Sequence, residues 1–213
     1  SRCFASGIYI GYDGNNTLSS ITNTIAKQCY VTNRIYQANN NNQNCTVKNN
    51  IVQNSISFSG TFSGEISNNT IFFNTNSSGY GLVLNAIAGG SLINIKNNIG
   101  TYLWGYSSIN VNSTYNIFYQ NQLGLPSSNK VNIPASSIFV GSIASTDAQY
   151  MLSATSPAKG AGEGGVDCGA FGGDEPYVIG GVPSGPVVYQ LSVPQSISSG
   201  STLNVTVKAR VQN

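Results

Sequence analysis

A short pattern recurs along the first 120 residues and constrains the fold more than any other feature of this chain. It consists of an aliphatic residue, a polar residue, an Asn-Asn pair or a near equivalent, and a hydrophobic residue that begins a strand. Its copies lie at residues 21–25, 47–51, 66–71, 95–99 and, less closely, 113–118. Their mean spacing is about 23 residues, and the longer intervals contain loop-like stretches at 39–44 and 79–90. A unit of this length, made of short strands and turns, predicts a solenoid of about five to seven coils whose strands stack in parallel.

Asparagine is concentrated in the same part of the chain. Of the 28 Asn residues, 26 lie at or before Asn132, whereas all seven Pro residues lie at Pro126 or later, so the composition changes near residue 125. Asn tolerates left-handed backbone at a turn, and its side-chain amide can bond to the Asn one coil away. We therefore expect Asn-lined turns with amide ladders around inward-facing rows of Ile, Val, Leu and Phe. No helical period is found.

The Asn-Asn-hydrophobic turns of residues 8–173 resemble those of the right-handed parallel β-helix superfamily that includes pectate-lyase-like proteins. A second resemblance lies downstream, where Ser156-Pro157-Ala158-Lys159-Gly160-Ala161-Gly162 is followed by Asp167-Cys168-Gly169-Ala170. This pattern is similar to the ending of many secreted bacterial β-helix proteins, in which the last coil closes. The resemblance implies an all-β fold, namely a right-handed single-stranded parallel β-helix, and an extracellular or cell-surface location. The Ser-Pro step and the Gly residues suit a tight backbone that covers an open coil end.

Two parts of the chain are expected. Residues 1–173 would form the β-helix with its closing segment, and residues 174–213 a Gly/Pro linker with a small C-terminal β-hairpin. The hairpin is predicted from two alternating runs, Val187 to Val193 and Leu203 to Val211, on either side of a Ser/Gly turn region. This tail resembles the C-terminal segments of surface proteins from Bacteroidetes-type bacteria.

Charge excludes several classes of function. Nine basic residues scattered over the whole chain, with a formal charge of +2, are too few for a nucleic-acid binder or a cationic membrane-surface binder. No apolar run approaches the roughly 18 to 20 residues of a transmembrane helix, so membrane insertion is not expected. No signal peptide is evident before Ser1, and we expect a mature product or a piece of a longer protein.

The four cysteines, Cys3, Cys29, Cys45 and Cys168, match no zinc-binding spacing, and the chain contains no His. A structural metal and a cofactor are therefore not expected. Cys3 and Cys29 are separated by the same interval as the first two copies of the repeat, so they could stack on adjacent coils. Four cysteines allow three pairings. The sequence therefore leaves two alternatives open, a disulfide between Cys3 and Cys29 or thiols that stay reduced and buried.

Acidic residues are few, and we assign no catalytic residue. Before residue 140 there are only Asp13 and Glu65, which lie roughly two coils apart by the repeat register, too far for a glycosidase pair. A second acidic group could form a weak Ca²⁺ site, but we favour a hydrated end loop. The four residues of this second acidic group are Glu163, Asp167, Asp174 and Glu175. Lys48 and Lys96 share one repeat position with Ser67 between them, which predicts a solvent-facing column rather than a catalytic pair.

Three aromatic residues form the candidate binding site. Alternate residues of a strand share a face, so Tyr102, Trp104 and Tyr106 would line one side of a strand while Leu103 points to the other. Flat aromatic strips suit sugar rings, which stack on them. The alternative is that these rings fill the core or a loop cluster.

Two classes of function follow. The first is a non-catalytic extracellular β-helix, either adhesin-like on a cell surface or a structural appendage, with a polysaccharide or cell-surface glycan as its partner and self-assembly as an option. The second is a fragment of a polysaccharide lyase or glycoside hydrolase whose catalytic coils lie upstream. A phage tail-fibre β-helix, which would be expected to trimerise, is a further alternative.

Overall fold

In the computed structural model, the described residues are 3–10, 21–37, 41–72, 81–85, 92–105, 111–141, 146–181, 185–194, 196, 200, 202, 203 and 205–212. The chain divides into two compact units, Ser1–Ile179 and Gly180–Asn213. The first unit therefore includes residues 174–179, which lie beyond the boundary expected from the sequence.

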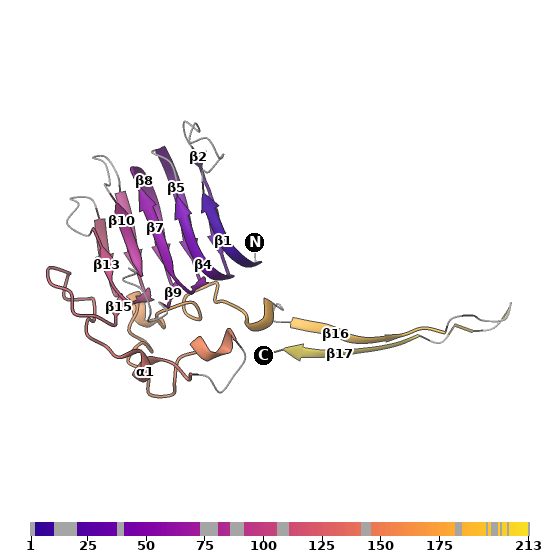
Figure 1. The fold of residues 1–213 in the computed structure, drawn as a ribbon. Coiled ribbons are helices and arrows are strands. Elements are labelled where there is room, and N and C mark those ends of the chain that lie inside the picture. The colour runs from indigo at the N-terminus through magenta and orange to yellow at the C-terminus, as the bar shows by residue number, and fades with distance from the viewer. Residues whose placement is uncertain are drawn as a thin grey trace. The chain divides into compact units, whose positions relative to one another are not determined.

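The described strands of the first unit form two parallel sheets (Figure 1). The larger sheet contains β1 (Cys3–Ile10), β4 (Cys29–Gln37), β6 (Ile51–Val52), β7 (Ser55–Ser59), β9 (Thr70–Ile71), β10 (Leu82–Asn85), β12 (Ile99–Gly100), β13 (Leu103–Trp104) and β15 (Ile117–Phe118). The second contains β2 (Ile21–Thr22), β3 (Ile25–Lys27), β5 (Asn41–Lys48), β8 (Thr61–Ser67), β11 (Leu92–Lys96) and β14 (Val111–Thr114). The predicted all-β class and parallel stacking are confirmed, and the arrangement is compatible with a solenoid.

Helical segments in the described residues are short. They are α1 (Ala135–Ile138), η1 (Ala148–Tyr150), η2 (Glu163–Gly165) and η3 (Ile179–Gly181). The second unit contains β16 (Gly185–Ser192) and β17 (Thr206–Gln212), which pair antiparallel, so the predicted C-terminal hairpin is confirmed.

One sequence-based alignment is wrong. The first copy of the repeat is not Ile21 to Ile25, because Lys27 pairs with Lys48 and places Gln28-Cys29 in register with Asn49-Asn50. The first interval is therefore 21 residues. The error arose because Cys29 occupies the position that Asn fills in the next four repeats.

Both sheets contribute side chains to one core. Ile35, Ile56, Leu82 and Leu103 form a fully buried row across the larger sheet, and Val47, Ile66 and Ile95 form another across the second sheet. In the second sheet these inward aliphatic residues alternate with outward polar ones, as the period of a strand requires. The predicted inward rows are confirmed.

Next to this core runs a ladder of buried amides, as the sequence predicted. The Nδ2 of each Asn donates to the Oδ1 of the next: Asn50 to Asn69 (3.0 Å), Asn69 to Asn98 (3.0 Å), Asn98 to Asn116 (2.9 Å) and Asn116 to Asn129 (2.9 Å). The same Oδ1 atoms accept backbone N–H groups, as in Asn69 N–H to Asn98 Oδ1 at 2.9 Å. Asn129 belongs to no copy of the repeat, so this last member of the ladder was not predicted from the sequence.

Candidate functional site

The candidate site lies where the strands of the second sheet end. Lys27, Lys48, Ser67 and Lys96 are register partners at the ends of β3, β5, β8 and β11, and we call them the lysine row. The expected sharing of one repeat position by Lys48, Ser67 and Lys96 is confirmed. The preceding residue of each strand points into the core, so these four side chains project from the outer face of the sheet.

The next position of each repeat has a left-handed backbone. Gln28, Asn49, Asn68 and Asn97, called the amide row, have φ values of 55°, 53°, 52° and 57°. Asn is well suited to this conformation because its short polar side chain can hydrogen-bond locally. The turn reverses the direction of the side chain, which leaves these amides available to contact another segment.

That segment is residues 163–177, called the closing segment. Asn49 Nδ2 donates to the carbonyls of Ala170 (3.0 Å) and Gly172 (2.7 Å). Asn68 Nδ2 donates to Asp167 O at 3.2 Å, and Asn97 Oδ1 accepts the Glu163 N–H at 2.8 Å. Gln28 Nε2 donates to the carbonyl of Pro176 at 2.9 Å. The amide row therefore binds the closing segment at four successive repeats.

This course differs from the expected cap over the last coil. Ala158 and Cys168 do pack with Ile117 of the last repeat, but the chain then runs back along the amide row toward the first repeat. Tyr177 reaches the buried cluster of Tyr30 and Ile51. The closing segment thus connects repeats rather than covering only one end.

Ion pairs strengthen the same contact. Glu175 accepts from Lys27 Nζ at 2.7 Å and also pairs with Lys48. Lys96 Nζ lies 3.0 Å from Glu163 Oε2 and 3.9 Å from Glu65 Oε2. The Ser67 hydroxyl donates to Glu65. Each ammonium of the lysine row is therefore close to a carboxylate.

The ionisation of these groups follows from the pairing. Hydrogen bonds from Lys27 and then Lys48 lower the pKa of Glu175 from 4.5 to about 2. The hydrogen bond with Glu163 raises the pKa of Lys96, and this effect exceeds the opposing effect of burial. Both groups remain charged at neutral pH.

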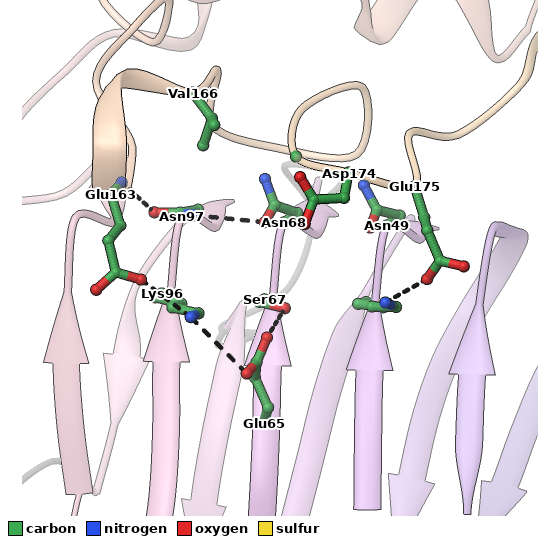
Figure 2. A pocket seen from close by; sticks show the side chains of 12 residues that line it. Asn49, Glu65, Ser67, Asn68, Lys96, Asn97, Glu163, Val166, Asp174 and Glu175 are labelled. Atoms are coloured by element: carbon green, nitrogen blue, oxygen red, sulfur yellow. Dashed lines mark hydrogen bonds and ion pairs between the residues drawn. The ribbon is translucent and has the colours of Figure 1, made fainter.

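A cavity of about 210 Å³ lies between the lysine row and the closing segment (Figure 2). Its charged lining side chains are Lys48, Glu65, Lys96, Glu163, Asp174 and Glu175. In Figure 2, Glu163 and Glu175 extend from the closing segment toward the strand ends, and Lys96 lies between Glu163 and Glu65. The cavity is smaller than the roughly 300 to 1,000 Å³ of typical small-molecule sites. Its two lysines are paired with three of its four carboxylates, those of Glu65, Glu163 and Glu175.

The acidic residues are grouped differently in the structure than their positions in the sequence indicated. Glu65 and Glu163, which are far apart in sequence, flank one lysine, whereas Glu163 and Glu175 contact different members of the lysine row. The Asp167 carboxylate accepts the Gly160 N–H at 2.8 Å. Asp13 lies outside the described residues. Among the residues that the structure describes, no three His, Cys, Asp or Glu side chains are grouped as metal ligands would be.

The aromatic candidates are only partly described. Leu103 is buried in the core, whereas Trp104 is 44% exposed and Tyr102 is half-buried. The ring centroids of Tyr102 and Trp104 are 6.4 Å apart. Strand β13 ends at Trp104, and Gly105 has a φ of 82°, so the alternation used to group the three rings extends only to Trp104. Tyr106 lies outside the described residues.

No protein-family model, curated protein or solved structure significantly matches this chain. Within the described residues, no helix is long and apolar enough to cross a membrane.

Proposed function

We propose that the first unit is a right-handed parallel β-helix like those of pectate-lyase-like proteins, and that it serves as a non-catalytic extracellular scaffold on a bacterial surface. Support for the fold comes from the parallel register between successive repeats and the ladder of buried amides. Support for the location comes from the resemblance of residues 156–162 and 167–170 to the endings of secreted β-helix proteins.

The observation that carries the scaffold proposal is the contact of the closing segment with four successive repeats. Glu163 and Glu175 are both used in ion pairs that hold this segment against the strand ends. A charged cavity whose three glutamates are already paired with lysines is better suited to fastening two parts of a chain than to turnover.

On this scaffold, Trp104 and Tyr102 provide the surface for a partner, and we assign it to uncharged glycans. A sugar ring would stack on Trp104. Such a site would bind weakly, with a Kd of about millimolar to tens of micromolar. Many copies on a cell surface would compensate for the weak single-site affinity.

A glycan array with matched variants tests this assignment. Trp104→Ala should abolish binding and change the melting temperature by less than about 2 °C, since Trp104 is well exposed. Tyr115→Asn is the control: Tyr115 is also exposed, and its φ of 57° suits Asn, so binding should persist. If Trp104→Ala instead lowers the melting temperature by about 6 °C or more, Trp104 is a packing residue and the glycan site is rejected.

A polysaccharide-cleaving enzyme is the second candidate, because Glu65 and Glu163 flank Lys96 at the edge of a cavity. Lyases of this fold family use a basic residue, but a lysine must be deprotonated to act as a general base, and the raised pKa of Lys96 keeps it protonated at neutral pH. Release of reducing ends or unsaturated uronates from a broad glycan panel, lost in Glu65→Gln, would favour the enzyme over the scaffold.

A further inference from the structure

Two cysteines continue the row of the amide ladder at its N-terminal end. Cys29 is in the ladder position of its repeat, and its N–H donates to Asn50 Oδ1 at 3.0 Å. Strands β1 and β4 are neighbours in the larger sheet (Figure 1). Cys3 is the register partner of Cys29 across this parallel pair. The last two positions of the ladder row therefore carry sulfur instead of an amide.

The backbone geometry of this pair suits a covalent link. Neighbouring strands of a sheet lie about 4.8 Å apart, which falls within the roughly 4.4 to 6.8 Å between Cα atoms that a disulfide spans. The two thiols interact with each other, and the Cys29 S–H donates to the carbonyl of Lys27 at 3.3 Å. Cys3 is exposed, whereas Cys29 is buried.

We propose that Cys3 and Cys29 form a disulfide that fastens β1 to β4 when the protein meets an oxidising environment. In the structure all four cysteines are reduced. The inference does not depend on the proposed scaffold or glycan function, because it concerns only the first two strands of the larger sheet.

The reaction is thiol–disulfide exchange with an external disulfide. The exposed Cys3 thiolate attacks one sulfur of that disulfide, which forms a mixed disulfide and releases one thiolate. The Cys29 thiol then loses its proton and attacks Cys3 Sγ, which forms the protein disulfide and releases the second thiolate. The protein loses two electrons and two protons, and the external disulfide is reduced to two thiols.

Exposure determines the order of these steps. Burial, together with the hydrogen bond to Cys3, raises the pKa of Cys29, so Cys29 is a poor first nucleophile and suits the resolving role. Cys45 is buried in β5 opposite Gly64, and Cys168 is buried near the carbonyl of Tyr115. Neither of them has a cysteine as its register partner, which makes them matched controls.

The test treats the full chain with oxidised glutathione, blocks the remaining thiols and measures intact mass and linked peptides. We expect a loss of about 2 Da, two alkylated cysteines instead of four, and one peptide pair joining Cys3 to Cys29. Cys3→Ser should abolish this link, whereas Cys45→Ser and Cys168→Ser should retain it. Because the link closes a long loop, the oxidised chain should melt about 5 °C or more above the chain kept in reductant.

Three results would overturn the proposal. They are four alkylated thiols after oxidation, a link that involves Cys45 or Cys168, and dimers joined through Cys3 alone. Loss of the link in Cys3→Ser would not be due to misfolding, since the Cys3 side chain is exposed. The melting temperature of this variant in reductant should equal that of the unmodified chain in reductant.

Discussion

Asparagine has two different roles at neighbouring positions of the repeat. At the left-handed position, Asn49, Asn68 and Asn97 direct their amides toward the closing segment. At the following position, the Asn amides are buried and bond along the stack. Since a buried amide without partners costs about 1 to 3 kcal/mol for each unpaired group, the ladder must be continuous to be stabilising.

Sequence spacing predicted the ladder but not its ends. The Asn-Asn pairs can be recognised in the sequence because Asn recurs at the same position of successive repeats. The first repeat was not recognised because Cys29 occupies that position instead of Asn. Asn129 is positioned by a turn, in which its N–H donates to Pro126 O at 3.0 Å, and no repeat surrounds it. A turn that brings one amide to the end of a stack leaves no periodic signal in the sequence.

Replacing the central amide should be costly. Asn69 Nδ2 donates to Val47 O (2.8 Å) and Ser67 O (3.0 Å), and its Oδ1 accepts from both nitrogens of Asn50. Asn69→Ala leaves these groups unpaired in a site with no exposed surface, so we expect a loss of about 3 kcal/mol in the free energy of unfolding. Urea unfolding monitored by circular dichroism measures this loss.

Asn112→Ala is the control for that experiment. Asn112 is exposed and donates one long bond, 3.3 Å, to Asn94 Oδ1. Its replacement should change the free energy of unfolding by less than about 0.5 kcal/mol. Equal effects of the two substitutions would show that the buried ladder adds nothing beyond an ordinary surface contact.

At the scale of elements, the closing segment matches the repeat because both present hydrogen-bonding groups in a line. Its backbone carbonyls and N–H groups meet the amide row, and its two glutamates meet the lysine row. The sequence indicated, from its Ser-Pro step and its Gly residues, that residues 156–170 close the fold. The sequence did not indicate the path of the closing segment, because the residues that this segment contacts lie up to 148 positions away in the chain.

Glu175 should make stability dependent on acid pH. Its folded pKa is lowered from 4.5 to about 2, so its stabilising effect is complete above about pH 4.5 and is lost as the pH falls toward 2. Glu175→Gln should therefore melt below the unmodified chain between pH 5 and 8, and the difference should shrink between about pH 4.5 and 2. Melting curves of both chains across this range measure the difference.

Asp174→Asn is the matched control, because Asp174 precedes Glu175 and forms none of the ion pairs found among the described residues. Its effect on melting should be smaller. High salt should also narrow the gap caused by Glu175→Gln, because Glu175 is partly exposed to solvent and its charge is screened. A gap that stays constant from pH 8 to pH 2 would show that the ion pairs do not stabilise the fold.

At the scale of the molecule, composition and repeat were sufficient to predict an all-β fold with parallel stacking of strands and a C-terminal hairpin. They placed the end of the first part at residue 173, whereas the compact unit extends to Ile179. The difference lies in Glu175, which pairs with Lys27 and Lys48, and in Tyr177, which is buried and whose hydroxyl donates to Asp147 Oδ2 at 3.1 Å. Contacts between residues so far apart in the chain leave no local pattern of alternating polar and apolar residues in the sequence.

Two truncations test how the first unit is completed. All three buried clusters lie within Ser1–Ile179, so a chain ending at Ile179 should keep its β-type circular dichroism and its cooperative melting. A chain ending at Gly162 lacks the closing segment and exposes Tyr30 and Ile51, which pack against Ala170 and Tyr177. It also leaves the amide row without its partners, so it should aggregate or lose cooperative melting. A soluble chain ending at Gly162 that melts like the chain ending at Ile179 would contradict the role of the closing segment, and substantial helical circular dichroism from either chain would contradict the fold.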